Sequence, residues 1–117
     1  MNIFNYITVL GDTPPVLANN GYSLDVLSPK DICVKPGAHV TMSAGFILKL
    51  PNNLLGMLAP KARMKSFVVT HGQMIHPNHE DELSITLKYS GFEELIIKKG
   101  EPLCQIVLVY GFKMSDD

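Results

Sequence analysis

The sequence predicts an all-β domain. Short apolar segments alternate with turns rich in Pro, Gly and Asn at intervals of about ten residues, a pattern typical of β-sandwiches and barrels. Residues 82–90 alternate strictly, with Leu83, Ile85, Leu87 and Tyr89 on one face. No segment keeps a helical period for more than about two turns. We therefore expect one β-barrel domain over residues 1–117.

The composition is that of a globular protein. Hydrophobic residues make up 46% and charged residues 18% of the chain, which excludes a disordered polar segment. The net charge of −1 gives no reason to expect a nucleic-acid partner or an anionic membrane surface. The N-terminus lacks a basic signal-peptide region, and no apolar run approaches the ~20 residues of a membrane helix. We expect a soluble, intracellular protein of the cytoplasm.

The strands are predicted between the turn signals. Residues 10–21 form a loop, because Pro14 and Pro15 exclude helix and Asn20-Gly21 marks a turn. In the strand that follows, Tyr22, Leu24 and Val26 are expected on one face. The full set of expected strands is 3–9, 22–27, 32–34, 38–43, 46–50, 57–59, 67–70, 82–90, 95–99 and 102–112.

The last strand carries information about assembly. Residues 103–109 are nearly all apolar, so both faces of this strand should be covered. A barrel of this size buries one face of each strand unaided. We expect other copies of the chain to cover the second apolar face of strands such as 103–109. The two cysteines, Cys33 and Cys104, lie in apolar contexts and are predicted to be buried free thiols.

Three groups of residues are candidates for chemistry. Lys61, Arg63 and Lys65 form a cationic loop after Pro60, which either holds phosphates or is a solvated basic turn. The segment 76–82 offers His76, His79 and three carboxylates, either as metal ligands or, as we favour, as a solvated hairpin tip. Gln105 lies inside an apolar run, where its amide either ties down a loop or contacts a ligand.

Together these pieces resemble the trimeric dUTP pyrophosphatase family, whose β-barrel fold is shared with dCTP deaminases. The resemblance covers about residues 20–109 and rests on five segments in register. These are Asn20 to Leu24, Lys35-Pro36-Gly37 with Ala44 to Ile47, Pro51 to Lys61, Gly72 to Glu82 and Gly100 to Ile106. The resemblance implies a distorted jelly-roll barrel that forms a homotrimer. It also implies that a nucleotide contacts Lys61, Ala62, Arg63, Lys65, Gly72, Met74, Ile75, His79 and Gln105.

The departures from the family pattern fall on functional positions. Ser23 stands where the first motif has aspartate, and Arg63 stands where the second motif has glycine. A side chain at that glycine position should obstruct the close backbone approach that glycine permits. His76 stands at the position of the water-activating aspartate of the third motif. Only eight residues follow Val109, so the glycine-rich C-terminal motif is missing. Lys88 occupies the glutamate position of the deaminase branch.

These losses imply a degenerate member of the family. Phosphoryl attack needs a positioned base, metal-held phosphates and a closed site, and this chain lacks parts of each. We expect a protein, of viral or phage origin by analogy, that binds a nucleotide or nucleotide-like ligand at inter-subunit clefts without hydrolysing it. The alternatives are a module that binds a host protein and a divergent nucleotide pyrophosphatase. No cofactor is predicted, with Mg²⁺ needed only if the enzyme alternative holds.

Overall fold

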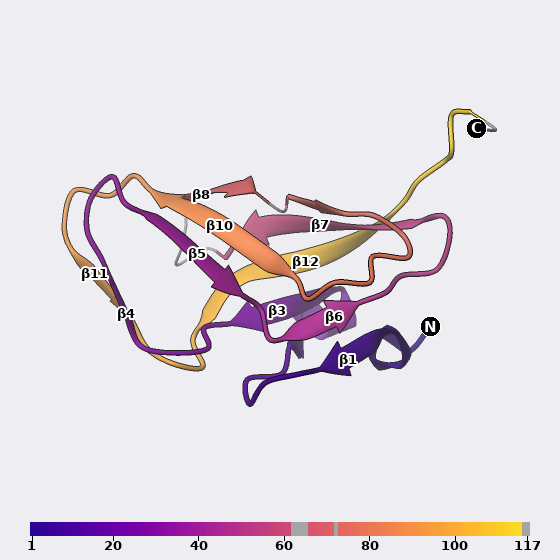
Figure 1. The fold of residues 1–117 in the computed structure, drawn as a ribbon, viewed down its shortest axis with the longest axis horizontal. Helices are drawn as coiled ribbons and strands as arrows, with labels where there is room; N and C mark the ends of the chain where they lie inside the picture. Colours follow the sequence, from indigo (N-terminus) through magenta and orange to yellow (C-terminus); the bar gives the residue numbers. More distant parts are fainter. Residues whose placement is uncertain (62–65, 72, 116–117) are drawn as a thin grey trace.

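The computed structural model describes residues 1–61, 66–71 and 73–115. The molecule is elongated, with extents of 47 × 29 × 26 Å, and its strands pair antiparallel throughout the described ladders (Figure 1). In these ranges no helix is both long enough and apolar enough to span a membrane. The expectation of an all-β barrel is confirmed.

The strands form two larger sheets and two ribbons. The five-stranded sheet has the order β2-β3-β12-β7-β9, and the three-stranded sheet the order β5-β10-β8. The ribbons are β1-β6 and β11-β4, and the second lies at the end of the molecule opposite the C-terminal tail (Figure 1). The strand bounds are β1 (Ile7–Val9), β2 (Val16–Ala18), β3 (Ser23–Leu27), β4 (Ile32–Val34), β5 (His39–Ser43), β6 (Phe46–Leu48), β7 (Leu54–Pro60), β8 (Phe67–His71), β9 (Met74–Ile75), β10 (Ser84–Tyr89), β11 (Leu95–Ile97) and β12 (Pro102–Tyr110).

The core lies between the two larger sheets. Alternation in β10 places Ile85, Leu87 and Tyr89 inside, as predicted, and Leu83 just before the strand is buried as well. The side chains that meet them from the other elements are the apolar, fully buried set Val26, Phe46, Leu48, Leu50, Leu103 and Ile106. A single apolar core therefore holds the sheets together.

Two expectations about the N-terminal part were wrong. The predicted strand 3–9 begins only at Ile7, because Ile3–Tyr6 forms a 3-10 helix, η1, whose first turn is capped by the Asn2 side chain accepting a 3.1 Å hydrogen bond from Phe4 N. The predicted loop 10–21 contains β2 and the 3-10 turn η2 (Asn19–Gly21). Tyr22 then precedes β3 and is 84% exposed, instead of packing with Leu24.

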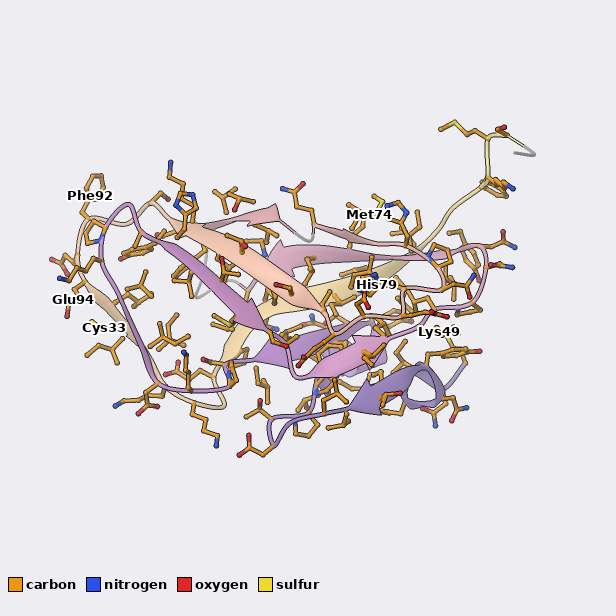
Figure 2. The ribbon with its side chains drawn as sticks, viewed as in Figure 1. Cys33, Lys49, Met74, His79, Phe92 and Glu94 are labelled. Carbon is orange, nitrogen blue, oxygen red and sulfur yellow. The ribbon has the colours of Figure 1, made fainter. Side chains whose placement is uncertain are left out.

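The prediction for the cysteines was half right. Cys104 is buried on β12, but Cys33 is exposed. Cys33 lies on β4, whose only described partner strand is β11, so the face of this ribbon that does not contact the core remains open. The Cys33 thiol donates a 2.9 Å hydrogen bond to Glu94 Oε1, near the end of the molecule where Phe92 also lies (Figure 2).

The outer face of the five-stranded sheet is open at β7, β9 and the second half of β12, whereas Ser23 and Asp25 on β3 are buried. Val107 pairs with Met57, and Met57 with Met74, so these side chains share a face and are 37%, 44% and 43% exposed. Gln105 and Asp25 continue the same face towards the other end of β12. The apolar sequence of β12 therefore reflects one buried face and one apolar face that is open in the single chain.

Candidate functional site

The first part of the candidate site is a cleft around His76. It measures about 640 Å³ and is lined by two turns and the start of the C-terminal tail: Asn52, Asn53, Leu55, His76, Pro77, Asn78, Gly111, Phe112 and Lys113. This size is in the range of small-molecule sites. A separate apolar cavity beneath Leu17 and Tyr22 measures about 50 Å³, which is too small for a nucleotide.

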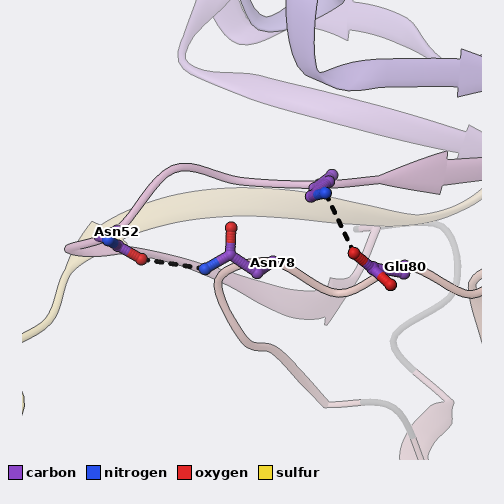
Figure 3. A network of polar contacts seen from close by, with 4 residues as sticks. Asn52, Asn78 and Glu80 are labelled. Atoms are coloured by element: carbon purple, nitrogen blue, oxygen red, sulfur yellow. Dashed lines mark hydrogen bonds and ion pairs between the residues drawn. The ribbon is translucent and has the colours of Figure 1, made fainter.

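Hydrogen bonds hold the three walls of the cleft together. Asn78 N donates to Leu50 O at 3.0 Å, and Asn78 Nδ2 donates to Asn52 Oδ1 at 3.0 Å (Figure 3). Gly111 N donates to Asn53 O at 2.9 Å, which fixes the start of the tail against the same turn. The cleft is therefore built by segments that lie far apart in the sequence.

An ion pair supports the same turns from the side. Lys49 Nζ lies 3.1 Å from Glu80 Oε1 (Figure 3), with 55% and 74% of the two side chains exposed. An exposed pair of this kind adds little stability, typically 0.2–1 kcal/mol. Glu80 is one of the carboxylates beside the histidines. Because it pairs with Lys49, it is not placed as a metal ligand.

The second part of the candidate site lies at the end of β7. Lys61 Nζ is 3.0 Å from Asp25 Oδ1 on β3, and both side chains are mostly buried. On the neighbouring strand, Gln105 Oε1 accepts a 3.1 Å hydrogen bond from Asn19 Nδ2, which also donates to Ser23 Oγ at 2.7 Å. Gln105 thus contacts η2 through its side-chain oxygen, and its contact with a ligand stays a prediction.

The two parts lie at opposite ends of β7. His76 shares its cleft with Leu55 at the start of the strand, and Lys61 follows six residues later, just past its end. At the ~3.3 Å rise of a strand residue, this places them about 20 Å apart. Among the described residues, Lys61 and His76 of one chain therefore do not meet around a compact ligand.

The remaining candidates are distributed between these parts. Met74 is exposed on the open sheet face, and His79 is half-buried towards the same end of the molecule (Figure 2). Ile75 is 2% exposed in the core beneath Gly56, which leaves only its backbone for a ligand. Ala62, Arg63, Lys65 and Gly72 lie outside the described residues.

The described residues do not fit a resident metal ion. In the described ranges, no three His, Cys, Asp or Glu side chains gather where they could hold a cation. Asp25 and Glu80 each face a lysine instead. No step of the chemistry considered below is routed through a protein-held metal.

Sequence reasoning missed three residues of this region. Asp25 was overlooked because the apolar alternation of 22–27 drew attention to the opposite face. Asn78 was overlooked although its position next to a proline marks a turn, and it does adopt the left-handed conformation with φ 61°. Phe112, 88% exposed at the rim of the cleft, was expected to end the last strand, but β12 ends at Tyr110.

Comparison with known sequences identifies the family. The sequence model of the dUTPase family matches residues 18–115, most of the chain. This chain belongs to the dUTPase family. A deoxyuridine 5′-triphosphate nucleotidohydrolase of Paramecium bursaria Chlorella virus 1 is 26% identical over 99 residues, and one of Aquifex aeolicus is 27% identical over 94 residues.

These matches cover 82% and 77% of this chain but only 70% and 63% of the two relatives. The chain is therefore shorter than the curated dUTPases it matches. For that reason we give the activity and substrate of the dUTPase family only as proposals for this chain.

Solved structures agree on the fold. EIAV dUTPase superposes with a TM-score of 0.81 at 15% identity, covering 95% of this chain and 93% of that one. The dUTPase of Staphylococcus bacteriophage 80alpha gives 0.80 at 14% identity, covering 95% and 92%. The structure of a mutant dUTPase from phage phi11 of S. aureus was described with a structural Mg(II) ion. The distorted jelly-roll barrel expected from the sequence is thus confirmed.

Proposed function

We propose that this chain binds a nucleotide or nucleotide-like ligand at clefts between copies of a homotrimer and does not hydrolyse it. The observation that carries the proposal is the chemistry of the His76 cleft. Among the described residues, its lining supplies amides, an imidazole, an ammonium and an aromatic ring, but no carboxylate. These groups suit recognition of a polar aromatic ligand better than activation of an attacking water.

The need for more than one copy follows from the distance between the two parts. A ligand whose base lies in the His76 cleft and whose phosphates meet Lys61 would take these groups from different chains, because the His76 cleft and Lys61 lie at opposite ends of β7 in one chain. The open apolar face at Met57, Met74 and Val107 is a suitable contact surface between copies. A viral or phage source belongs to the same proposal and is supported by the names of several relatives.

A second candidate is a divergent pyrophosphatase. His76 is exposed in the cleft, and imidazole is a common general base. If this candidate is right, the wild type hydrolyses dUTP and the His76→Ala variant does not. A third candidate, binding of a host protein, is favoured by Phe92, which is 98% exposed at a loop tip.

The test is calorimetric titration with dUTP, with and without Mg²⁺, followed by chromatography of the recovered nucleotide. Arg63→Ala should weaken binding by roughly 1.5–3 kcal/mol, as for other charge-assisted hydrogen bonds. Lys88→Ala, on the outer face of β10, is the matched control and should bind as the wild type does. Release of dUMP and pyrophosphate would contradict the non-hydrolytic proposal, and absence of binding to any nucleotide would contradict both nucleotide candidates.

A further inference from the structure

Asp25 is a buried carboxylate on the outer face of the five-stranded sheet. It lies in the middle of β3, where its Cα partners are Val16 on β2 and Gln105 on β12. The residue is 9% exposed, and Ser23 on the same face of β3 is 6% exposed. A carboxylate in such a position needs a compensating partner.

That partner is Lys61. The Nζ–Oδ1 distance is 3.0 Å, with 23% of the lysine side chain and 12% of the aspartate side chain exposed. By comparison, the Lys49–Glu80 and Lys99–Asp12 pairs have side chains that are at least half exposed. Asp25 Oδ1 accepts no hydrogen bond within the described chain, so its compensation comes from the lysine charge.

A second group of polar contacts lies beside the ion pair. Asn19 in η2 donates to both Ser23 Oγ and Gln105 Oε1, at 2.7 and 3.1 Å. Gln105 lies between Asp25 and Ala59 in the register of β12, and Lys61 follows two residues after Ala59. The ion pair and these contacts therefore occupy neighbouring positions on β3, β12 and the end of β7.

We infer that Asp25 is a positioning residue for phosphate binding, which acts by holding Lys61 in place on the sheet. The inference rests on the proposed nucleotide binding. A free lysine side chain loses rotamer entropy when it binds a ligand, and a lysine that is already held in place loses less. The ion pair holds the Lys61 ammonium at the end of β7.

The sign of one mutational effect separates this role from simple electrostatics. If Asp25 only contributed negative charge, its neutralisation would strengthen binding of an anionic ligand. If Asp25 positions Lys61, its neutralisation weakens that binding because the lysine loses its fixed place. Asp25→Asn keeps the size of the side chain and removes the charge, so it measures this sign directly.

The experiment compares deoxyuridine, dUMP and dUTP as probes, each titrated into the wild type, Asp25→Asn, Asp25→Glu and Lys61→Met. We expect Asp25→Asn to weaken dUTP binding by about tenfold or more and deoxyuridine binding by less than about twofold, because only the phosphates depend on Lys61. Asp25→Glu should recover part of the dUTP affinity. A variant that combines Asp25→Asn with Lys61→Met should bind dUTP no more weakly than Lys61→Met alone. Both changes break the same interaction, so their effects should not add.

The outcomes separate failure of this inference from failure of the proposed function. If the wild type binds dUTP and folded Asp25→Asn binds it equally or more tightly, the inference is overturned while nucleotide binding stands. If Asp25→Asn does not fold, Lys61→Met decides, and unchanged dUTP affinity in that variant overturns the inference. If the folded wild type binds none of the three probes, the proposed function fails and the positioning role fails with it.

Discussion

The Asn78 side chain donates a 3.0 Å hydrogen bond to Asn52 and so joins the two turns that frame the His76 cleft (Figure 3). The backbone of Asn78 adds a second link, from its N to Leu50 O. Asn78 itself has φ 61°, in the left-handed region that Asn tolerates better than most residues. Both its side chain and its conformation therefore support the shape of the cleft.

Substitution of Asn78 separates these two contributions. Asn78→Gly keeps the left-handed conformation and removes the side-chain hydrogen bond, so we expect a loss of about 0.5–1 kcal/mol in the free energy of unfolding. Asn78→Ala adds backbone strain of about 1 kcal/mol to the same loss. Urea unfolding measures both. Equal stability of the Ala and Gly variants would show that the left-handed turn is not maintained in solution.

The open sheet face predicts how copies of the chain associate. Met57→Lys places a charge between Val107 and Met74, and we expect it to dissociate the proposed trimer because a buried, unpaired charge opposes association. Thr41→Lys on the exposed side of β5 is the matched control. Sedimentation velocity gives the answer. If both variants remain trimers, the interface lies elsewhere. If the wild type is a monomer, the proposed interface does not exist.

The loop after β10 depends on a glycine. Tyr89 Oη donates a 2.6 Å hydrogen bond to Glu93 O, and a Cβ at Gly91 would lie 2.1 Å from that hydroxyl oxygen. We expect Gly91→Ala to lower the free energy of unfolding by about 1–3 kcal/mol through overpacking. A Cβ at Gly11 would meet nothing closer than 3.7 Å, so Gly11→Ala should stay within about 0.5 kcal/mol of the wild type. Similar melting temperatures for the two variants would argue against this loop packing.

The two thiols should differ in reactivity. Burial raises the pKa of Cys104 to about 12, and at pH 8 it should not react with a disulfide reagent until the chain unfolds. Cys33 is accessible, but its hydrogen bond to Glu94 raises the pKa of its thiol. Glu94→Gln should therefore speed the reaction of Cys33 at pH 8, whereas the neighbouring Glu93→Gln should not. Two fast thiols in the folded wild type would contradict this assignment.

Much of the fold could be predicted because alternation was clear wherever one strand face was buried. Leu83, Ile85, Leu87 and Tyr89 entered the core as the pattern of 82–90 predicted. The errors came where a local hydrogen bond or pairing at the edge of a sheet decided the structure and the hydrophobic alternation did not. Asn2 capped a 3-10 turn over residues read as strand, and Val16–Ala18 joined the sheet although two prolines precede them.

The site was less predictable because its contacts join distant parts of the chain. Lys61 was singled out as a cation, but its partner Asp25 lies 36 positions earlier and belongs to a strand chosen for its apolar face. Asn52 and Asn78 are 26 positions apart in the sequence and are joined in the folded structure. Side-chain type and spacing gave candidate residues, whereas the partners of these residues required the pairing register of the sheets.

The measurement that most directly tests the central claim is a thermal melt of the purified chain against dUTP, other nucleotides and cyclic signalling nucleotides, with and without Mg²⁺. A ligand at about a hundredfold over its dissociation constant adds roughly 2.7 kcal/mol, a clear shift for a domain of this size. Our account predicts a shift with at least one nucleotide that is recovered intact afterwards. A shift accompanied by conversion of dUTP to dUMP would show that the chain is an active enzyme and contradict the account.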